Sequence, residues 1–251
     1  HAAIGSVILL SATLTHETKE KLMLPYGGSS SNRDYPLVTH VSSAGEVTEF
    51  PLLASVTKRV VKVTQWHAGD LMPDRTQQTQ LIQWAKAGAM VAVICNTVLD
   101  AQILYAQLMS IGDIEVDLFH ARFTTQDRMD REQFVLNKYG KHAPRKGGLL
   151  IASQVVEQSL DLDFDVIISQ LAPIEFVIQR MGRLWRHDRN EDNESNLVKR
   201  SSVIETPLFI VLCPTLEQVK KDVSSAYLAS GYVYKNLRAM YRTQCYLDNL
   251  E

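Results

Sequence analysis

The sequence has few cysteines and no long apolar run. Its three cysteines, Cys95, Cys213 and Cys245, are far apart, and they form no CxxC pair and no disulfide framework. We therefore expect a protein of a reducing compartment, the cytoplasm. No run approaches the ~18 apolar residues that a membrane span needs.

The sequence also has no excess of charge of either sign. Lysine and arginine total 26, aspartate and glutamate total 28, and the net charge is -2. Bulk charge therefore gives no sign of nucleic-acid binding, so any nucleic acid would have to be held in a local groove. The chain begins with His1 and enters an apolar run, Val7–Leu10, almost at once. This predicts a piece of a longer polypeptide.

Short apolar runs alternate with amphipathic helical patterns along the 251 residues. Buried strands separated by such helices predict an α/β fold with a parallel sheet covered on both faces. The predicted strands are 7–10, 38–42, 48–52, 60–66, 90–95, 115–120, 149–153, 165–169 and 208–213. The predicted helices are 15–24, 74–87, 97–112, 125–139, 173–185, 216–229 and 232–247.

One segment, QRMGRLWRH (179–187), carries a row of cations around a glycine. If it is helical, Gln179, Arg183 and Arg186 share one face, and Val177, Met181 and Leu184 form an apolar stripe roughly opposite. Gly182 would cost ~1 kcal/mol in a helix interior, which suggests a close approach by another group. No acidic residue on the same helix pairs with these arginines, and rows of guanidinium groups suit phosphate. The alternative is an ordinary solvated polar face.

Polar residues follow two of the predicted strands. The segment ASQVVEQSLDLDFD (152–165) places hydroxyl, amide and carboxylate groups after a buried strand, and Ser11-Ala12-Thr13 follow the first strand. Loops after the carboxyl ends of parallel strands form the ligand crevice of such sheets. Each segment alone is also compatible with an ordinary loop.

Taken together, these segments resemble motifs III, V and VI of superfamily 2 helicases. The wording ASQVVEQSLDLDFD, the pair Ala172-Pro173 and QRMGRLWRH are similar to the helicase–nuclease of type I CRISPR systems. The segments CNTV (95–98) and FHARFTTQDRMDRE (119–132) fit the same family, and the resemblance covers about residues 1–214. It implies a RecA-like sheet, with residues 1–66 as the end of a first lobe and linker, 67–214 as the second lobe and 215–251 as the start of a C-terminal helical region.

The resemblance also implies roles for individual residues. Arg183 and Arg186 match arginine fingers that reach the ATP phosphates, and Gln179 matches a γ-phosphate sensor. On the cofactor side it implies Asp161, Glu157 and Ser159. For coupling between the lobes it implies Ser11 and Thr13. For contacts with the nucleic-acid backbone it implies Ser153, Gln154, Asn96, Thr97 and Arg122.

The implied activity is ATP-driven, 3′-to-5′ movement on single-stranded DNA in antiviral defence. The implied cofactor is ATP with Mg²⁺, and the implied partners are single-stranded DNA, a guide-RNA surveillance complex, the first lobe and a nuclease domain. A P-loop, GxxxxGK[ST], is missing, because the only Gly-Lys pair, Gly140-Lys141, is followed by His142. No DExH acid pair follows any strand. We therefore expect this chain alone to be inactive.

Other readings stay open. A superfamily 2 helicase acting on RNA, or a docking module that has lost the motor, would share the lobe. We expect no metal site, because His187-Asp188 is isolated from the other histidines. We interpret the tryptophans 66, 84 and 185 as packing residues and two basic clusters as surface charge; the clusters are Lys58, Arg59 and Lys62, and Lys138, Lys141, Arg145 and Lys146.

Overall fold

A computed structural model describes residues 6–11, 13–53, 59–112, 114–157, 160–189 and 199–250. The chain divides into two compact units, 1–59 and 60–251. Each unit is described by itself below. Among the described residues, no helix combines the length and the apolar character needed to cross a membrane.

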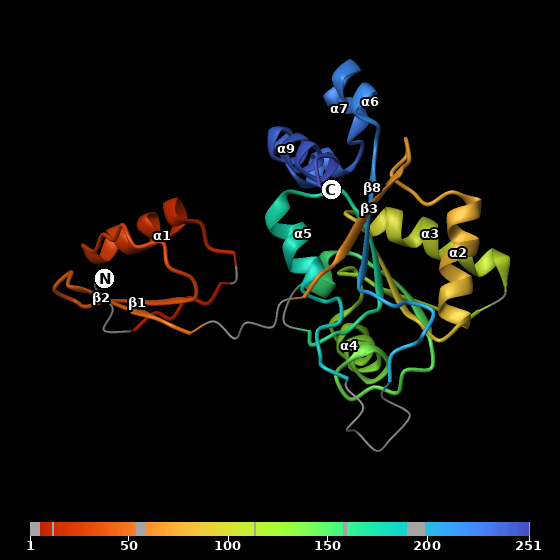
Figure 1. Ribbon diagram of the computed structural model, residues 1–251, viewed down its shortest axis with the longest axis horizontal. Coiled ribbons are helices and arrows are strands. Elements are labelled where there is room, and N and C mark those ends of the chain that lie inside the picture. Colours follow the sequence, from red (N-terminus) through yellow and green to blue (C-terminus); the bar gives the residue numbers. More distant parts are fainter. Residues whose placement is uncertain are drawn as a thin grey trace. The chain divides into compact units, whose positions relative to one another are not determined.

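The first unit combines a helix with a two-stranded antiparallel sheet (Figure 1). Helix α1 (His16–Met23) begins where Thr15 Oγ1 accepts a hydrogen bond from the backbone of Thr18, as its sequence predicts, and a short turn η1 (Leu24–Tyr26) follows. Strands β1 (Leu37–Val41) and β2 (Val47–Pro51) pair over their full length.

The predicted strand at Val7–Leu10 is wrong. These residues adopt no strand conformation, and their side chains are exposed, Leu10 by 92%. An apolar run becomes a strand only where neighbouring strands satisfy its backbone groups. No described residue of the first unit pairs with this segment.

The second unit is built on a six-stranded parallel sheet in the order β3-β8-β7-β4-β6-β5. Its strands are β3 (Lys62–His67), β4 (Met90–Ile94), β5 (Val116–Phe119), β6 (Gly148–Ala152), β7 (Val166–Gln170) and β8 (Leu208–Cys213). All neighbouring pairs are parallel, which confirms the predicted sheet. Because β3 pairs with β8, the second unit starts at Val60 and includes residues that we had assigned to the linker.

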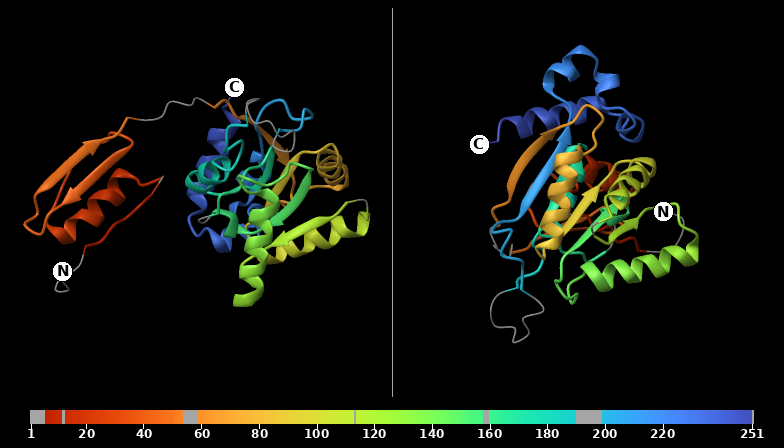
Figure 2. Two further views of the ribbon diagram at one scale, coloured as in Figure 1. Left: turned by 90° about the horizontal axis from the view of Figure 1, so that it is seen from below. Right: turned by 90° about the vertical axis from the view of Figure 1, so that its right-hand side faces the viewer.

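Helices cover both faces of this sheet (Figures 1 and 2). Helices α2 (Arg75–Lys86) and α3 (Val98–Ile111) pack on one face, against residues such as Val91 and Val93. Helices α4 (Thr125–Tyr139) and α5 (Ile174–Met181) pack on the other, against Ala92 and Ile94 of the same strand. The alternation along β4 is the period of two that a strand covered on both sides requires.

The C-terminal segment packs into the second unit. We predicted two helices in this segment, whereas its described residues form four: α6 (Leu216–Lys221), α7 (Val223–Ala226), α8 (Ser230–Val233) and α9 (Leu237–Asp248). They gather beyond the carboxyl end of β8 (Figure 2). Tyr227, Met240 and Leu247 join the same core cluster as α4 and α5. Residues 215–250 are therefore part of this compact unit.

Packing of the tryptophans follows the prediction in part. Trp66 of β3 and Trp84 of α2 stack with ring centroids 6.3 Å apart, and both are partly buried against the core on the α2 and α3 face of the sheet. Trp185 lies outside both core clusters, with the Arg200 guanidinium 4.7 Å above its ring. Its φ of 43° is a left-handed conformation that an L-residue seldom adopts.

Candidate functional site

The arginine-bearing segment is a helix end followed by a tight loop. We predicted a helix to Trp185, but α5 ends at Met181, and Gly182 is its C-cap with φ −62° and ψ −4°. Gly182 is therefore no interior glycine, and its predicted cost in a helix does not arise. The loop then runs beside residue 164: the Phe164 amide donates to Arg183 O, and the Trp185 amide donates to Phe164 O.

This ending overturns the predicted single polar face. Gln179 lies on α5, whereas Arg183 and Arg186 lie on the loop that follows. Arg183 is buried, 8% exposed, and its guanidinium donates to the carbonyl oxygens of Leu160 and Glu157. Burial, and Arg186 nearby, lower the pKa of Arg183. Because arginine starts far above neutral pH, it stays charged.

Arg186 is the accessible cation of the pair. Its side chain is 39% exposed, and its Nε lies 2.7 Å from Asp161 Oδ1. His187 Nε2 lies 2.9 Å from the same oxygen. The structure thus brings Asp161 and Arg186 together, although the sequence shows no acidic residue close to Arg186 on its N-terminal side. The partner comes from the segment between β6 and β7, and the chain's local pattern does not reveal it.

Two buried aspartates hold this loop in place. Asp163 Oδ1 accepts from the Arg186 backbone amide at 3.0 Å. Asp163 also pairs with Arg189 at 2.7 Å and with Arg200 at 3.0 Å. Asp165 pairs with Arg145 at 2.6 Å and with Arg200 at 3.0 Å. Both carboxylates are fully buried, so a cluster of charge-assisted hydrogen bonds fixes the backbone that carries Arg186.

This cluster corrects our interpretation of the second basic group. Arg145 is a buried ion-pair partner with a side chain 1% exposed, and it is not a surface charge. Lys138 lies 2.7 Å from Asp117, which also accepts from the Tyr139 hydroxyl at 2.5 Å. Burial and this carboxylate raise the pKa of Tyr139. In the first basic group, Lys58 lies outside the described residues.

The carboxyl ends of β4, β6 and β7 meet at one edge of the sheet, because β4 lies between the other two. Asn96, Ser153 and Gln170 come from these ends and are all buried. Asn96 Nδ2 donates to Leu171 O at 2.7 Å and to Ser230 Oγ at 2.9 Å. The Asn96 side chain is thus hydrogen-bonded within the chain, and the contact of Asn96 with nucleic acid stays a prediction.

The other predicted nucleic-acid residues differ in access. Ser153 is fully buried, and its Oγ has no hydrogen-bond partner among the described residues, so it is out of reach of a ligand here. Gln154 is partly exposed and donates to the Asn96 carbonyl. Thr97 is partly buried and caps α3 through the Asp100 amide at 3.0 Å. Arg122 is exposed.

The remaining predicted positions lie apart from this loop or carry other contacts. Glu157 is partly buried, and its carboxylate binds Arg180. Ser159 lies outside the described residues. Ser11 is exposed and accepts from the Thr13 amide at 3.2 Å, and both residues belong to the first unit. Of the described His, Cys, Asp and Glu side chains, no three lie together in a way that could hold a metal ion.

Sequence reasoning missed Arg180, the most strongly bonded side chain of the site. It is fully buried and donates to Glu157, Ser169, Gln170, Asn96 and Tyr234 at 2.7–3.0 Å. A signal was present: Arg180 follows Val177 by three residues, so it lies on the inward stripe of α5. A charged residue on a buried stripe indicates a specific set of partners.

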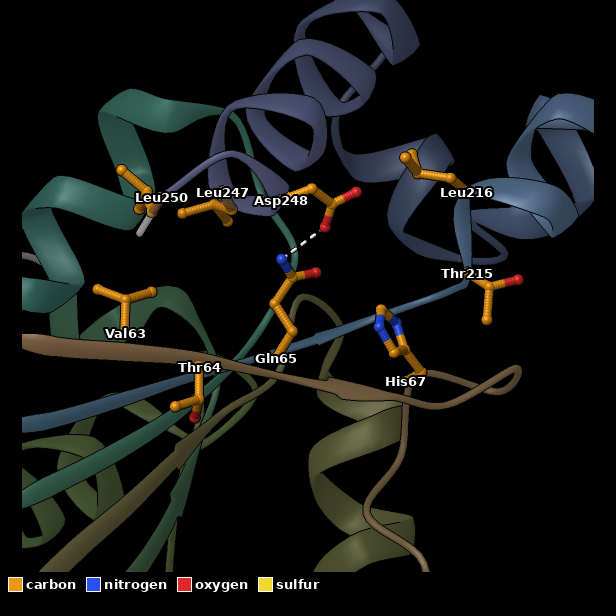
Figure 3. A pocket seen from close by; sticks show the side chains of 9 residues that line it. All are labelled: Val63, Thr64, Gln65, His67, Thr215, Leu216, Leu247, Asp248 and Leu250. Carbon is orange, nitrogen blue, oxygen red and sulfur yellow. Dashed lines mark hydrogen bonds between the residues drawn. The ribbon is translucent and has the colours of Figure 1, made fainter.

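A hollow of about 420 Å³ lies elsewhere in the second unit, between β3 and the end of α9 (Figure 3). Gln65 Nε2 donates to Asp248 Oδ1 across it at 2.5 Å. The Cys213 thiol beneath donates to Gln65 Oε1 at 2.9 Å, and burial raises the pKa of that thiol to about 12. None of its lining residues was predicted to bind a ligand, and a thiol with so high a pKa is a poor nucleophile at neutral pH.

Known proteins are similar to nearly the whole chain. The family described as "CRISPR-associated nuclease/helicase Cas3, C-terminal" matches residues 87–189. The chain is 38% identical over 257 residues to the CRISPR-associated endonuclease/helicase Cas3 of Escherichia coli (strain K12), covering 98% of this chain and 27% of that protein. It is 32% identical over 264 residues to the Cas3 nuclease/helicase of Streptococcus thermophilus, covering 97% and 25%.

A solved structure supports the same relationship. The one described as "Crystal structure of T. fusca Cas3-AMPPNP" matches with a TM-score of 0.77 and 29% sequence identity, over 96% of this chain and 29% of that chain. The predicted RecA-like α/β fold is therefore confirmed. The chain spans about a quarter of the length of the curated relatives it matches.

Proposed function

We propose that the chain forms the second RecA-like lobe of an ATP-driven, single-stranded DNA translocase, because nearly its whole length is homologous to Cas3 nuclease/helicases. The observation that supports this most strongly is the loop with Arg183 and Arg186. It presents one accessible guanidinium, backed by a buried one, on a backbone fixed by Asp163. Such a preorganised cation suits a phosphate whose charge grows in a transition state.

The residues fit one half of a nucleotide site. Arg186 and Asp161 are accessible and adjacent, and Arg183 lies behind them. A phosphate would take the place of Asp161 beside Arg186, and Asp161 would then be available to ribose hydroxyls. The P-loop that holds the phosphates and Mg²⁺ in such enzymes is not in this sequence. ATP with Mg²⁺ is therefore the proposed cofactor of the full-length protein, and Arg183, Arg186 and Gln179 are its proposed contacts from this lobe.

On the nucleic-acid side, three of the five predicted residues are at least partly exposed. Arg122 is exposed, Gln154 is partly exposed, and the amide end of α3 at Thr97 faces the same carboxyl-end edge as Gln154. Proteins that bind single-stranded DNA without sequence preference usually contact its phosphates through amides, hydroxyls and guanidinium groups. Movement from 3′ to 5′, a guide-RNA surveillance complex and a nuclease domain as partners are proposed from the family resemblance. So is coupling of the two lobes through Ser11 and Thr13.

The test is ATP hydrolysis by the full-length protein, with and without single-stranded DNA. We expect hydrolysis that DNA stimulates, and we expect the 251-residue chain alone to show no turnover above background. Stimulation by RNA in place of DNA would favour the RNA helicase alternative. A full-length protein that binds the DNA but never hydrolyses ATP would contradict the motor and favour a docking module.

A further inference from the structure

The guanidinium of Arg180 connects both predicted sites inside the second unit. All five of its N–H donors have an acceptor: Nε uses Glu157 Oε1 at 2.7 Å, and Nη1 uses Ser169 Oγ and Gln170 O. Nη2 uses Asn96 Oδ1 at 3.0 Å and the Tyr234 hydroxyl at 2.9 Å. Because the group is fully buried, solvent water cannot replace one of these partners when that partner moves away.

Helix α8 of the C-terminal segment is docked onto this cluster by two side chains. Tyr234, next to the end of α8, accepts from Arg180, and Ser230, its first residue, accepts from Asn96 Nδ2 at 2.9 Å. The Tyr234 ring also packs on Phe176 of α5, with centroids 5.1 Å apart. The C-terminal segment is therefore hydrogen-bonded to the strand ends where the predicted nucleic-acid contacts lie.

Gln154 is the partly exposed residue that is hydrogen-bonded to the buried cluster around Arg180. Its Nε2 donates to the Asn96 carbonyl, and its side chain also contacts the Tyr234 hydroxyl. Unlike Arg180 and Asn96, Gln154 is partly exposed. Its orientation is thus set from two sides by members of the buried cluster.

We propose that Tyr234 and Arg180 are positioning residues that couple the nucleic-acid contact at Gln154 to the nucleotide-side carboxylate of Glu157. The inference rests on the proposed function. A shift of Glu157 pulls on Arg180, and Arg180 cannot follow without disturbing Asn96 and Tyr234, which orient Gln154. In return, single-stranded DNA bound at Gln154 favours one position of the Glu157 carboxylate through the same contacts. Because the bonds are charge-assisted and desolvated, they form a stiff connection.

Tyr234→Phe in the full-length protein tests this link, with hydrolysis of ATP followed while single-stranded DNA is titrated. The variant removes one hydroxyl and keeps the ring on Phe176. We expect the half-saturating DNA concentration to rise about ten-fold, the equivalent of one lost hydrogen bond to a charged group. The KM for ATP without DNA should stay within about two-fold, because Tyr234 contacts Arg180 and Phe176 and, among the described residues, not the loop that carries Arg183 and Arg186.

Tyr227→Phe is the matched control. Tyr227 is fully buried in the same C-terminal segment, and its hydroxyl donates to Gln244 at 3.2 Å, away from Arg180. We expect wild-type DNA dependence for this variant. Should Tyr234→Phe not fold, Ser230→Ala removes only the acceptor of Asn96 Nδ2 and is expected to raise the half-saturating DNA concentration several-fold. Tyr234→Phe added to Gln154→Ala should have no further effect, since both act through one contact.

Wild-type DNA dependence in Tyr234→Phe, or in Ser230→Ala where the former does not fold, would overturn the inference. An equal shift in Tyr227→Phe would also overturn it, because the effect would then report only general packing. Hydrolysis in the wild-type protein that DNA does not stimulate would overturn the proposed function itself, and the inference with it.

Discussion

Arg186 and Asp161 form an ion pair, with Nε and Oδ1 2.7 Å apart. Both were expected to contact the nucleotide, and in the structure each is a partner of the other. Their side chains are 39% and 47% exposed, so the pair contributes only about 0–1 kcal/mol. A phosphate would therefore displace Asp161 from Arg186 at small cost, and the pairing keeps the cation oriented until then.

Arg186→Ala should abolish most ATP hydrolysis in the full-length protein while leaving its stability unchanged. An arginine finger contributes about 10³-fold or more to the rate, whereas the exposed pair adds little to folding. Steady-state hydrolysis and thermal unfolding measure the two effects. Arg128→Ala, on the exposed side of α4, is the control and should retain both. Loss of single-strand binding in parallel with hydrolysis would contradict the phosphate-finger role.

Arg183→Ala should reduce both hydrolysis and stability. Arg183 is buried, and its guanidinium donates to the carbonyl oxygens of Leu160 and Glu157, so its loss leaves one buried and one partly buried acceptor without this donor. We expect about 1–3 kcal/mol less unfolding free energy by urea titration. Arg183→Lys keeps the charge but not the two-pronged contact, so its hydrolysis rate and its unfolding free energy should lie between those of the wild type and those of Arg183→Ala. Wild-type stability in Arg183→Ala would show that these hydrogen bonds do not matter.

Local sequence signals predicted most of the fold. The buried runs MVAVI (90–94) and LFIVLC (208–213) are strands as expected, because uninterrupted apolar runs of this length suit a sheet covered on both faces. Thr15, Asp74 and Thr97 cap helices as predicted. These features depend on residues a few positions apart, and the sequence displays such spacing directly.

The site was predicted less well because its decisive contacts join distant residues. Asn96 meets Arg180 and Ser230, and Asp163 meets Arg200, over separations that no periodic pattern encodes. The end of α5 was misplaced for a similar reason. The loop from Gly182 turns to pair Leu184 with Phe164, and this tertiary contact overrides the helical pattern of its side chains.

Asp163→Ala should destabilise the second unit strongly. Removing one carboxylate leaves Arg189 and Arg200 as buried cations with fewer partners, and such a loss typically costs about 3–5 kcal/mol. Guanidinium titration followed by tryptophan fluorescence would measure it, because Trp185 lies under Arg200. Asp130→Ala, on the exposed face of α4, should change the unfolding free energy by less than about 0.5 kcal/mol. Equal effects of the two variants would contradict a structural role for the cluster.

In the first unit, Glu49 of β2 is held by Lys19 of α1. The Lys19 Nζ lies 2.6 Å from Glu49 Oε1, and Ser30 Oγ donates to the same oxygen at 2.6 Å. These hydrogen bonds lower the pKa of Glu49 from 4.5 to about 2. The bond between α1 and the two-stranded sheet therefore depends on the charged form of this carboxyl.

The first unit should lose stability in acid through Glu49. Because the folded pKa is below the unfolded one, the stabilisation is present above pH 4.5 and is lost as the pH falls toward 2. Glu49→Gln should remove about 1–2 kcal/mol at neutral pH, a figure reduced for solvent screening, and should flatten the dependence between those pH values. Amide hydrogen exchange of β1 and β2, corrected for intrinsic rates, measures this. Glu17→Gln, whose carboxylate pairs with Lys21 on the exposed surface of α1, is the control and should keep the wild-type profile. An acid profile in Glu49→Gln identical to that of the wild type would assign the transition to another group.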